Sequence, residues 1–200
     1  MPESPLAPLV VKLGGSLLDS PRLASWLEAL ARPAPRARLV VAGGGPFADA
    51  VRTGQKRWAF SDLAAHRMAI LAMQQTALLL HDREPRLEPV EDTAGIEALC
   101  RKCGAGVWLP WRLAGYEPSL PASWQVTSDS IALWLASFLE ARAAVIVKRG
   151  QPPRDPRRAA ALGVVDGAFA AFLEGLSCPV HILGEEESGR LSGILRGDEG

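Results

Sequence analysis

Short, mainly apolar segments alternate along the chain with longer stretches whose apolar residues recur at helical spacing. The short segments lie at residues 9–13, 36–42, 87–90, 106–109, 143–147 and 180–183. The helical stretches lie at residues 21–32, 61–81, 93–103, 128–136, 166–173 and 187–195. Strands of a parallel sheet are buried on both faces and therefore read as apolar runs, and helices connect them. The pattern predicts an α/β protein with an open, mostly parallel sheet sandwiched between helices.

Turn and capping residues mark where several of these elements begin and end. Ser20-Pro21 predicts the start of a helix, because serine favours the N-cap and proline the first helical position. Ser61 can cap the long helix that follows it, and Gly104 ends the next one. Proline-rich stretches, which we expect to be loops, lie at residues 110–124 and 151–158.

The helix predicted at residues 61–81 carries apolar residues on most of its circumference. Such a helix is buried, either centrally or at a subunit interface. We therefore expect a homodimer or a larger homo-oligomer that buries it. His66, on the same helix, is expected to pack or hydrogen-bond at its edge, and a catalytic role is the alternative.

The composition fits a single domain of 200 residues with a sizeable core. Hydrophobic residues make up 48% of the chain and the net charge is zero, which argues against a general nucleic-acid or membrane-surface binder. No apolar run has the length of a membrane span, and the first residues lack the pattern of a signal peptide. We expect a cytoplasmic protein in which residues 1–8, with three prolines, form a loose arm.

The first strand ends in a turn that can bind an anion, Lys12-Leu13-Gly14-Gly15-Ser16. Two glycines let backbone N–H groups turn toward a ligand, because no Cβ blocks the approach. Lys12 adds a compact positive charge beside the turn, so the expected ligand is a phosphate. A Walker A loop does not fit, since its lysine follows the glycines. The alternative is a buried strand whose lysine reaches outward to solvent.

A second glycine turn, Gly43-Gly44-Gly45-Pro46, follows the second strand. With Ala48 it formally matches a variant of the dinucleotide-binding fingerprint. However, it does not follow the first strand, and no acidic residue closes a following strand about 20 residues on. Two other interpretations remain, a loop that holds a substrate against a phosphate donor and a plain tight turn.

Two further candidate residues lie at the ends of predicted elements. Lys148 follows the apolar run at 143–147, and open α/β sheets bind ligands beyond the carboxyl ends of their strands. The chain has few lysines, so each stands out where arginine would otherwise serve: Lys12, Lys56, Lys102 and Lys148. Asp129 falls in the first turn of a helix, beside the positive end of its dipole. The alternatives are a lysine on a solvated loop and a simple capping motif.

The segment at 12–16 resembles the opening strand of the amino acid kinase family, which includes acetylglutamate, aspartate, uridylate and isopentenyl phosphate kinases. The resemblance implies the αβα fold of that family, with an acceptor-binding lobe at about 9–140 and a nucleotide-binding lobe at about 141–200. It also implies ATP and Mg²⁺ as cofactors and a small-molecule phosphate acceptor. The segment at 126–132, VTSDSIA, resembles a branch of the family that phosphorylates aminomethylfuran-methyl phosphate, a phosphate monoester, in methanofuran biosynthesis.

The same resemblance implies roles for individual residues. Asp129 would position two lysines, and the catalytic residues would be Lys12, Asp129 and Lys148. The nucleotide phosphates would bind Gly14, Gly15, Ser16 and Lys148. The acceptor substrate would bind Gly43, Gly44, Gly45, Gln125, Thr127 and Ser128.

Two departures from the family pattern favour a different function. Many relatives have a later lysine that contacts the transferred phosphoryl group, whereas no lysine follows Lys148 here. Gln125 stands where an acidic residue is expected in the aminomethylfuran branch. The alternative is therefore a non-catalytic sensor or storage protein of the same fold that binds a nucleotide or another anion.

A metal site is not expected. Cys100-x-x-Cys103 and Cys178-x-x-His181 formally make a zinc ligand set. The two pairs are far apart in sequence, and the second pair runs into a predicted core strand. Reduced thiols are the expected state of the cysteines.

Overall fold

The computed structural model describes residues 7–197, and its centre is a parallel sheet. The strands are β1 Leu9–Leu13, β2 Arg38–Ala42, β3 Glu88–Val90, β4 Ala105–Trp108, β5 Ala143–Lys148 and β6 Val180–Gly184. In the described residues they form one six-stranded sheet in the order β3-β4-β2-β1-β5-β6, with every neighbouring pair parallel. The predicted α/β class and parallel sheet are confirmed. The predicted arm at residues 1–8 lies mostly outside the described range.

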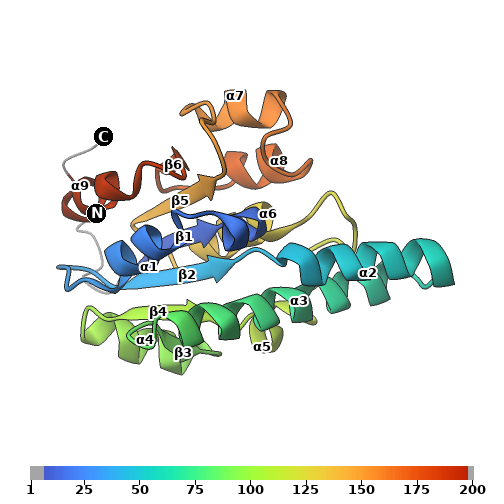
Figure 1. Ribbon diagram of the computed structural model, residues 1–200, viewed down its shortest axis with the longest axis horizontal. Coiled ribbons are helices and arrows are strands. Elements are labelled where there is room, and N and C mark those ends of the chain that lie inside the picture. The colour runs from blue at the N-terminus through green and yellow to red at the C-terminus, as the bar shows by residue number, and fades with distance from the viewer. Residues whose placement is uncertain (1–6, 198–200) are drawn as a thin grey trace.

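Helices cover both faces of this sheet (Figure 1). In chain order they are α1 Leu23–Ala31, α2 Gly45–Trp58, α3 Asp62–Arg83, α4 Thr93–Arg101, α5 Trp111–Ala114, α6 Ser128–Phe138, α7 Pro156–Ala161, α8 Phe169–Glu174 and α9 Leu191–Arg196. Short 3-10 turns, η1 Gly15–Asp19 and η2 Ser188–Arg190, follow β1 and precede α9. The architecture is therefore a sheet between two helical layers.

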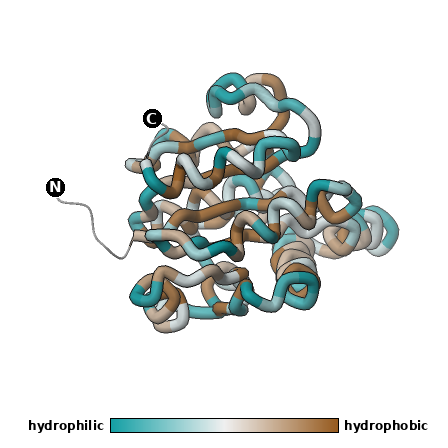
Figure 2. Tube along the Cα trace, turned by 60° about the vertical axis from the view of Figure 1, so that its left-hand side comes forward, coloured by the Kyte–Doolittle hydropathy of each residue, from teal (hydrophilic) through white to brown (hydrophobic). Residues whose placement is uncertain are grey.

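Alternate strand residues divide the core into two apolar layers. Val10 and Ile146 pack on one side with α4, α6 and α8, whereas Val11 and Val147 pack on the other with α1 and α9. Figure 2 shows these apolar strands in the middle of the molecule, with hydrophilic loops on the outside. Because the inner strands are apolar on both faces, their sequence could be recognised as continuous apolar runs.

The strand register brings the ends of β1, β2 and β5 to one edge of the sheet. Leu13 is paired with Ala42 of β2 on one side and with Val147 of β5 on the other. The turns that follow these strands therefore start side by side. Figure 1 shows α2 and the first half of α3 extending beyond this edge as a helical hairpin. This hairpin forms one wall beside the turns.

At the opposite edge of the sheet, where the strands begin, the buried side chain of Arg38 joins neighbouring segments. Its guanidinium group donates hydrogen bonds to four backbone carbonyls, those of Leu30, Arg32, Arg36 and Cys103, at 2.7–3.1 Å. Burial lowers the pKa of Arg38. These bonds satisfy the carbonyls at the end of α1 and fix the connection to β2.

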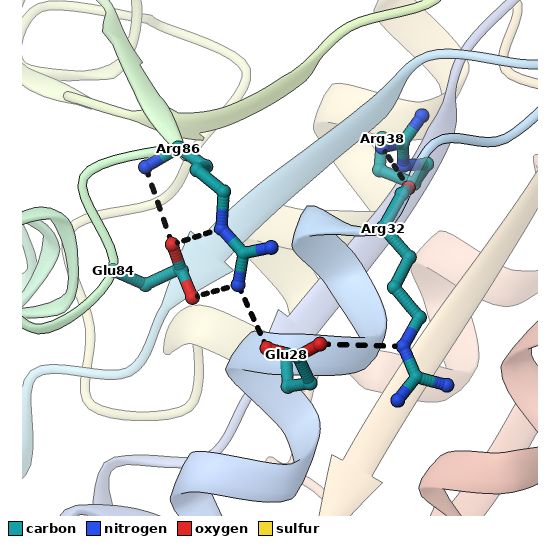
Figure 3. A network of polar contacts seen from close by, with 5 residues as sticks. All are labelled: Glu28, Arg32, Arg38, Glu84 and Arg86. Atoms are coloured by element: carbon teal, nitrogen blue, oxygen red, sulfur yellow. Dashed lines mark hydrogen bonds and ion pairs between the residues drawn. The ribbon is translucent and has the colours of Figure 1, made fainter.

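An exposed ion-pair network lies beside Arg38. Figure 3 shows Glu28 between the side chains of Arg32 and Arg86, with Glu84 on the far side of Arg86. Arg86 approaches Glu28 at 2.7 Å and Glu84 at 2.6 Å. Arg32, Glu28 and Arg86 are largely exposed, and only the Glu84 side chain is mostly covered, so each pair adds little to stability.

Several elements differ from the sequence prediction. Helix α1 begins at Leu23 rather than at Pro21, because the Ser20 hydroxyl donates to the Glu185 carboxylate and accepts from the Arg22 N–H in a turn. Helix α2 was not predicted at all, and α5 and α7 lie inside stretches that were predicted to be loops. These helices are short or mostly polar, so they lack the apolar periodicity of a buried helix.

Candidate active site

Three of the predicted catalytic residues meet at the carboxyl ends of the central strands. The Lys12 Nζ lies 2.6 Å from Asp129 Oδ1, and the Lys148 Nζ lies 2.8 Å from Asp129 Oδ2. Lys12 comes from β1, Lys148 from the end of β5, and Asp129 from the first turn of α6. One carboxylate thus bridges two ammonium groups from neighbouring strands.

Burial makes this bridge electrostatically demanding. Lys12 and Asp129 are each only 3% exposed, whereas the Lys148 side chain is 20% exposed. Burial would raise the pKa of Asp129, but the charges of Lys12 and Lys148 outweigh it and hold that pKa below its usual value. Burial lowers the pKa of Lys12, although the Asp129 charge acts in the opposite direction. The three side chains of this bridge, two cations and one anion, carry a net positive charge.

The glycine turns after β1 and β2 lie in direct backbone contact. A Cβ added to Gly15 would lie 2.3 Å from the Gly45 nitrogen, and one added to Gly43 would lie 2.4 Å from the Gly15 nitrogen. Gly45 also has a φ of 52°, a conformation that favours glycine. The two turns therefore need glycine to fit against each other.

The cation cluster lies directly beside these turns. A Cβ on Gly14 would lie 3.4 Å from the Lys12 Nζ and 3.7 Å from the Ser16 hydroxyl oxygen, so both groups lie over the turn. The Gly14 N–H donates a hydrogen bond to the Val147 carbonyl at 3.2 Å, and this bond joins the turn to β5. Lys12, Gly14, Gly15 and Ser16 are thus brought together as the sequence predicted.

Helix α6 presents Asp129 through an unusual N-terminus. Thr127 is the N-cap residue, but its side chain caps no N–H group of the helix in the described part of the chain. Instead, the carboxylate of Asp166 accepts hydrogen bonds from the N–H groups of Thr127 and Ser130, at 2.8 and 3.0 Å. Sequence reasoning missed this role of Asp166, which it had placed at the start of a helix.

A cavity of about 60 Å³ adjoins the second glycine turn. Its polar lining includes Thr127 and Ser128 from the start of α6, together with Arg52 and His66 from the helical hairpin. Its remaining walls are mainly apolar and include Trp124, on whose ring the Arg52 guanidinium lies at 4.3 Å. The cavity therefore combines apolar surface with a cation.

His66 was expected at the edge of its helix, and it lies in the wall of this cavity. It is 8% exposed, and among the residues that the structure describes its Nε2 atom has no hydrogen-bond partner. Burial and the neighbouring Arg67 lower its pKa, so the ring is neutral at pH 7. A neutral imidazole with an unused nitrogen can donate to or accept from a bound molecule.

Of the predicted acceptor residues, Gly44, Thr127 and Ser128 line this cavity, whereas Gly43, Gly45 and Gln125 do not. Gln125 is exposed, and its side-chain oxygen lies where a Cβ on residue 167 would be, so Gly167 makes room for it. Its backbone carbonyl accepts from the Ala168 N–H at 2.9 Å. The structure therefore separates Gln125 from the other candidates.

Metal ligands are not gathered in the described part of the chain. No three side chains of His, Cys, Asp or Glu between residues 7 and 197 are grouped so that they could hold a metal ion. Cys100, Cys103 and Cys178 are free thiols. Among the same residues, no helix combines the length and apolar character needed to cross a membrane.

The fold matches solved kinases of one family. The uridylate kinase of Archaeoglobus fulgidus superposes with a TM-score of 0.68 at 17% identity, covering 95% of this chain and 96% of that structure. The UMP kinase of Bacillus anthracis superposes with a TM-score of 0.67 at 15% identity, covering 96% and 92%. The chain thus has the amino acid kinase fold that the sequence resemblance implied.

A curated relative refines the comparison. The chain is 26% identical over 138 residues to the [5-(aminomethyl)furan-3-yl]methyl phosphate kinase of Methanocaldococcus jannaschii. The match covers 68% of this chain and 63% of that kinase, less than two thirds of its length. No family model matches the chain. These comparisons confirm that the chain resembles the amino acid kinase family and its aminomethylfuran branch.

Proposed function

We propose that the protein is an ATP-dependent kinase that phosphorylates a small molecule. The observation that carries the proposal is the Asp129 carboxylate, which holds Lys12 and Lys148 at 2.6 and 2.8 Å beside two interlocked glycine turns. Phosphoryl transfer depends mainly on positioning and on neutralising charge at the phosphoryl oxygens. Two fixed ammonium groups and a backbone turn open to anions supply both.

In this proposal the residues divide the work between donor and acceptor. The turn at Gly14, Gly15 and Ser16 binds the ATP phosphates, and residues 141–200 form the nucleotide lobe. Lys12 and Lys148 neutralise the oxygens of the transferring phosphoryl group, with Lys148 in place of the missing later lysine. An oxygen of the acceptor forms a bond to the γ-phosphorus as the bond to the β–γ bridging oxygen breaks, and ADP leaves.

Magnesium would enter with ATP rather than from a protein site. Mg²⁺ commonly binds through substrate phosphates with few protein ligands, and the described residues form no metal-binding cluster of their own. When bound, the ion neutralises charge on the donor phosphates. The protein's own contribution to that charge is the pair of lysines.

The acceptor is proposed to be a phosphate monoester that becomes a diphosphate. The cavity beside Gly44 has a cation, Arg52, at its wall and hydroxyl groups from Thr127 and Ser128. Its apolar walls can contact a flat ring such as the furan of the substrate named for the M. jannaschii kinase, but a cavity of about 60 Å³ encloses only part of such a molecule. No carboxylate lines this cavity, so an amine on the acceptor would have to lie outside it.

The assay that tests this proposal measures ADP release from ATP–Mg²⁺ with a panel of phosphate monoesters, including aminomethylfuran-methyl phosphate. We expect acceptor-dependent ADP release by the wild-type protein. Lys12→Met should reduce it about 100-fold, as loss of a charge-stabilising group does. Lys102→Met is the matched control, because Lys102 is exposed and pairs with Glu88 away from the site.

The same assay decides between the proposal and its alternative. Tight binding of ATP in isothermal titration, with no ADP release for any acceptor, would favour a nucleotide-binding sensor or storage protein. The absence of a lysine after Lys148 is the observation in favour of that alternative. ADP release that depends on both the acceptor and Lys12 would exclude it.

A further inference from the structure

The carboxylate of Asp166 binds the N-terminus of α6 at four points. Its Oδ2 atom accepts from the N–H and hydroxyl groups of Thr127, each at 2.8 Å, and from the Ser130 N–H at 3.0 Å. Its Oδ1 atom accepts from the Ser130 hydroxyl. Asp166 lies 36 residues after Ser130. One side chain thus satisfies groups that a helix usually satisfies through its own N-cap.

These contacts surround the residue that bridges the lysines. Asp129 lies between Ser128 and Ser130 in the first turn of α6, and Ser130 is fully buried. Because the N-cap side chain of Thr127 caps no helical N–H group, the geometry of this turn depends on Asp166. A displaced first turn would move the Asp129 carboxylate away from one or both lysines.

We propose that Asp166 is a positioning residue that fixes the first turn of α6, so that Asp129 holds Lys12 and Lys148 together for phosphoryl transfer. The inference rests on the proposed kinase function for its catalytic part. It also gives the segment between α7 and α8 a role, since that segment supplies the carboxylate. Asp166 acts through α6 and does not itself need to touch a substrate.

The charge of Asp166 also acts on Lys12. The charged groups that face Lys12 are Asp129 from α6, Lys148 from β5 and Asp166 from the segment before α8. The two carboxylates raise the pKa of Lys12, while burial and Lys148 lower it. Loss of the Asp166 charge should therefore make Lys12 release its proton at lower pH. If Asp166 stabilised the helix only through its hydrogen bonds, a substitution that kept those bonds would leave the pKa of Lys12 unchanged.

Two substitutions separate these contributions. Asp166→Asn removes the charge but keeps an oxygen that can accept from the Thr127 and Ser130 N–H groups. Asp166→Ala removes both the charge and the hydrogen bonds. The matched control is Asp92→Ala, because Asp92 caps α4 by accepting from the Gly95 N–H at 3.0 Å and follows β3, which β4 and β2 separate from β1 in the sheet.

The first readout needs no catalysis. With only four lysines in the chain, the side-chain CεH₂ signals can be assigned by single substitutions and followed by NMR as the pH rises, without nucleotide. We expect the Lys12 signal to titrate at lower pH in Asp166→Asn than in the wild type, and the Lys148 signal to shift in Asp166→Ala. The Asp92→Ala protein should show wild-type lysine titrations.

The second readout is kinetic. Asp166→Asn should lower kcat about 10-fold and Asp166→Ala about 100-fold, as misplaced catalytic groups do, with KM for ATP changed less than about 3-fold. Asp92→Ala should lower the melting temperature and leave kcat unchanged.

Either of two results would overturn the inference. One is a Lys12 titration and a Lys148 signal that both match the wild type in folded Asp166→Asn and Asp166→Ala proteins. The other is a kcat in both Asp166 variants no lower than in Asp92→Ala. If the wild-type protein transfers no phosphoryl group to any acceptor, the proposed function fails, and the lysine titrations alone decide whether Asp166 positions the cluster.

Discussion

At the scale of single residues, the site depends on one buried carboxylate that neutralises two ammonium groups. Removing one member of a buried ion cluster leaves uncompensated charge and typically costs about 3–5 kcal/mol. Lys148 is partly exposed and can move into solvent, whereas Lys12 is enclosed. The effect of losing Asp129 should therefore be felt mainly through Lys12.

We predict that Asp129→Asn lowers both stability and kcat. The variant leaves Lys12 buried beside Lys148 with no carboxylate in direct contact, so the free energy of unfolding should fall by about 3–5 kcal/mol. Urea unfolding measures this change. The double variant Asp129→Asn/Lys12→Met should recover much of the lost stability, because the unpaired buried charge is gone, while remaining inactive. A double variant no more stable than Asp129→Asn would show that the pairing with Lys12 does not matter for folding.

The pKa directions predict how activity and stability depend on pH. Burial lowers the pKa of Lys12 from its ordinary 10.5, so kcat/KM for ATP should fall on the alkaline side below that pH. The pKa of Asp129 is held below its ordinary 3.8. Its contribution to stability is therefore fully present above about pH 4 and is lost as the pH falls through the lower, folded-state value. A kcat/KM that stays level up to pH 10.5 would contradict this account of Lys12.

Lys12, Lys148 and Asp129 could be singled out from the sequence because each has a local signal, but only the family resemblance implied that they act together. The lysines end apolar strands, and Asp129 follows a recognisable helix start. Asp166, Arg52 and His66 have no such signal. Their contacts join segments far apart in the sequence, and only the packing of α2, α3 and the segment before α8 brings them to the site.

At the scale of elements, the site depends on two turns that can approach each other only because both are glycine-rich. Gly15, Gly43 and Gly45 contact one another through backbone atoms at distances that a Cβ would block. Behind them, the Thr76 hydroxyl of α3 donates to the Gly44 carbonyl at 3.3 Å. The helical hairpin therefore supports the turn that lines the acceptor cavity.

We predict that Gly43→Ala disrupts both turns. The new methyl group would lie 2.4 Å from the Gly15 nitrogen, and the turns must move apart, at a cost of about 1–3 kcal/mol. Because the phosphate turn moves with them, ATP affinity should fall in isothermal titration. Gly189→Ala is the matched control, since nothing lies within 4 Å of its added Cβ. Equal effects of the two substitutions would argue against a close fit between the turns.

Elements were predictable from sequence where burial leaves an apolar pattern. All six strands of the sheet were expected near their observed positions, and α3 begins after its predicted cap, Ser61, which accepts from the Ala64 N–H at 3.2 Å. Helix α2 was not predicted from the sequence because it begins in glycines and a proline and has only Val51 and Gly54 buried. Tertiary contact with α3, rather than its own periodicity, determines it.

At the scale of the whole molecule, one face of α3 remains apolar and exposed. Met68, Leu71 and Leu78 are 38–50% exposed and recur at helical spacing on one side of the helix. Exposed apolar residues gathered on one surface can mark a protein–protein interface. The oligomer predicted from the sequence would cover it.

We predict that Leu71→Glu and Leu78→Glu each weaken self-association. A two-fold interface uses the same surface of both subunits, so each substitution places two charges in the interface of a dimer. Light scattering at micromolar concentration should give a dimer or larger assembly for the wild type and a smaller mass for the variants. Leu162→Glu is the control, because Leu162 is 62% exposed on a different surface. A wild-type protein that is strictly monomeric would contradict the prediction.

Direct detection of the phosphorylated product shows whether the Lys12–Asp129–Lys148 cluster catalyses phosphoryl transfer. Phosphorus NMR of ATP–Mg²⁺ with a phosphate monoester distinguishes a new diphosphate from simple ATP hydrolysis. We expect the diphosphate signals of the wild type and of Lys102→Met to grow together with those of ADP. In Lys12→Met the same signals should grow at least about 100-fold more slowly. Equal diphosphate formation by wild-type and folded Lys12→Met protein would contradict this expectation.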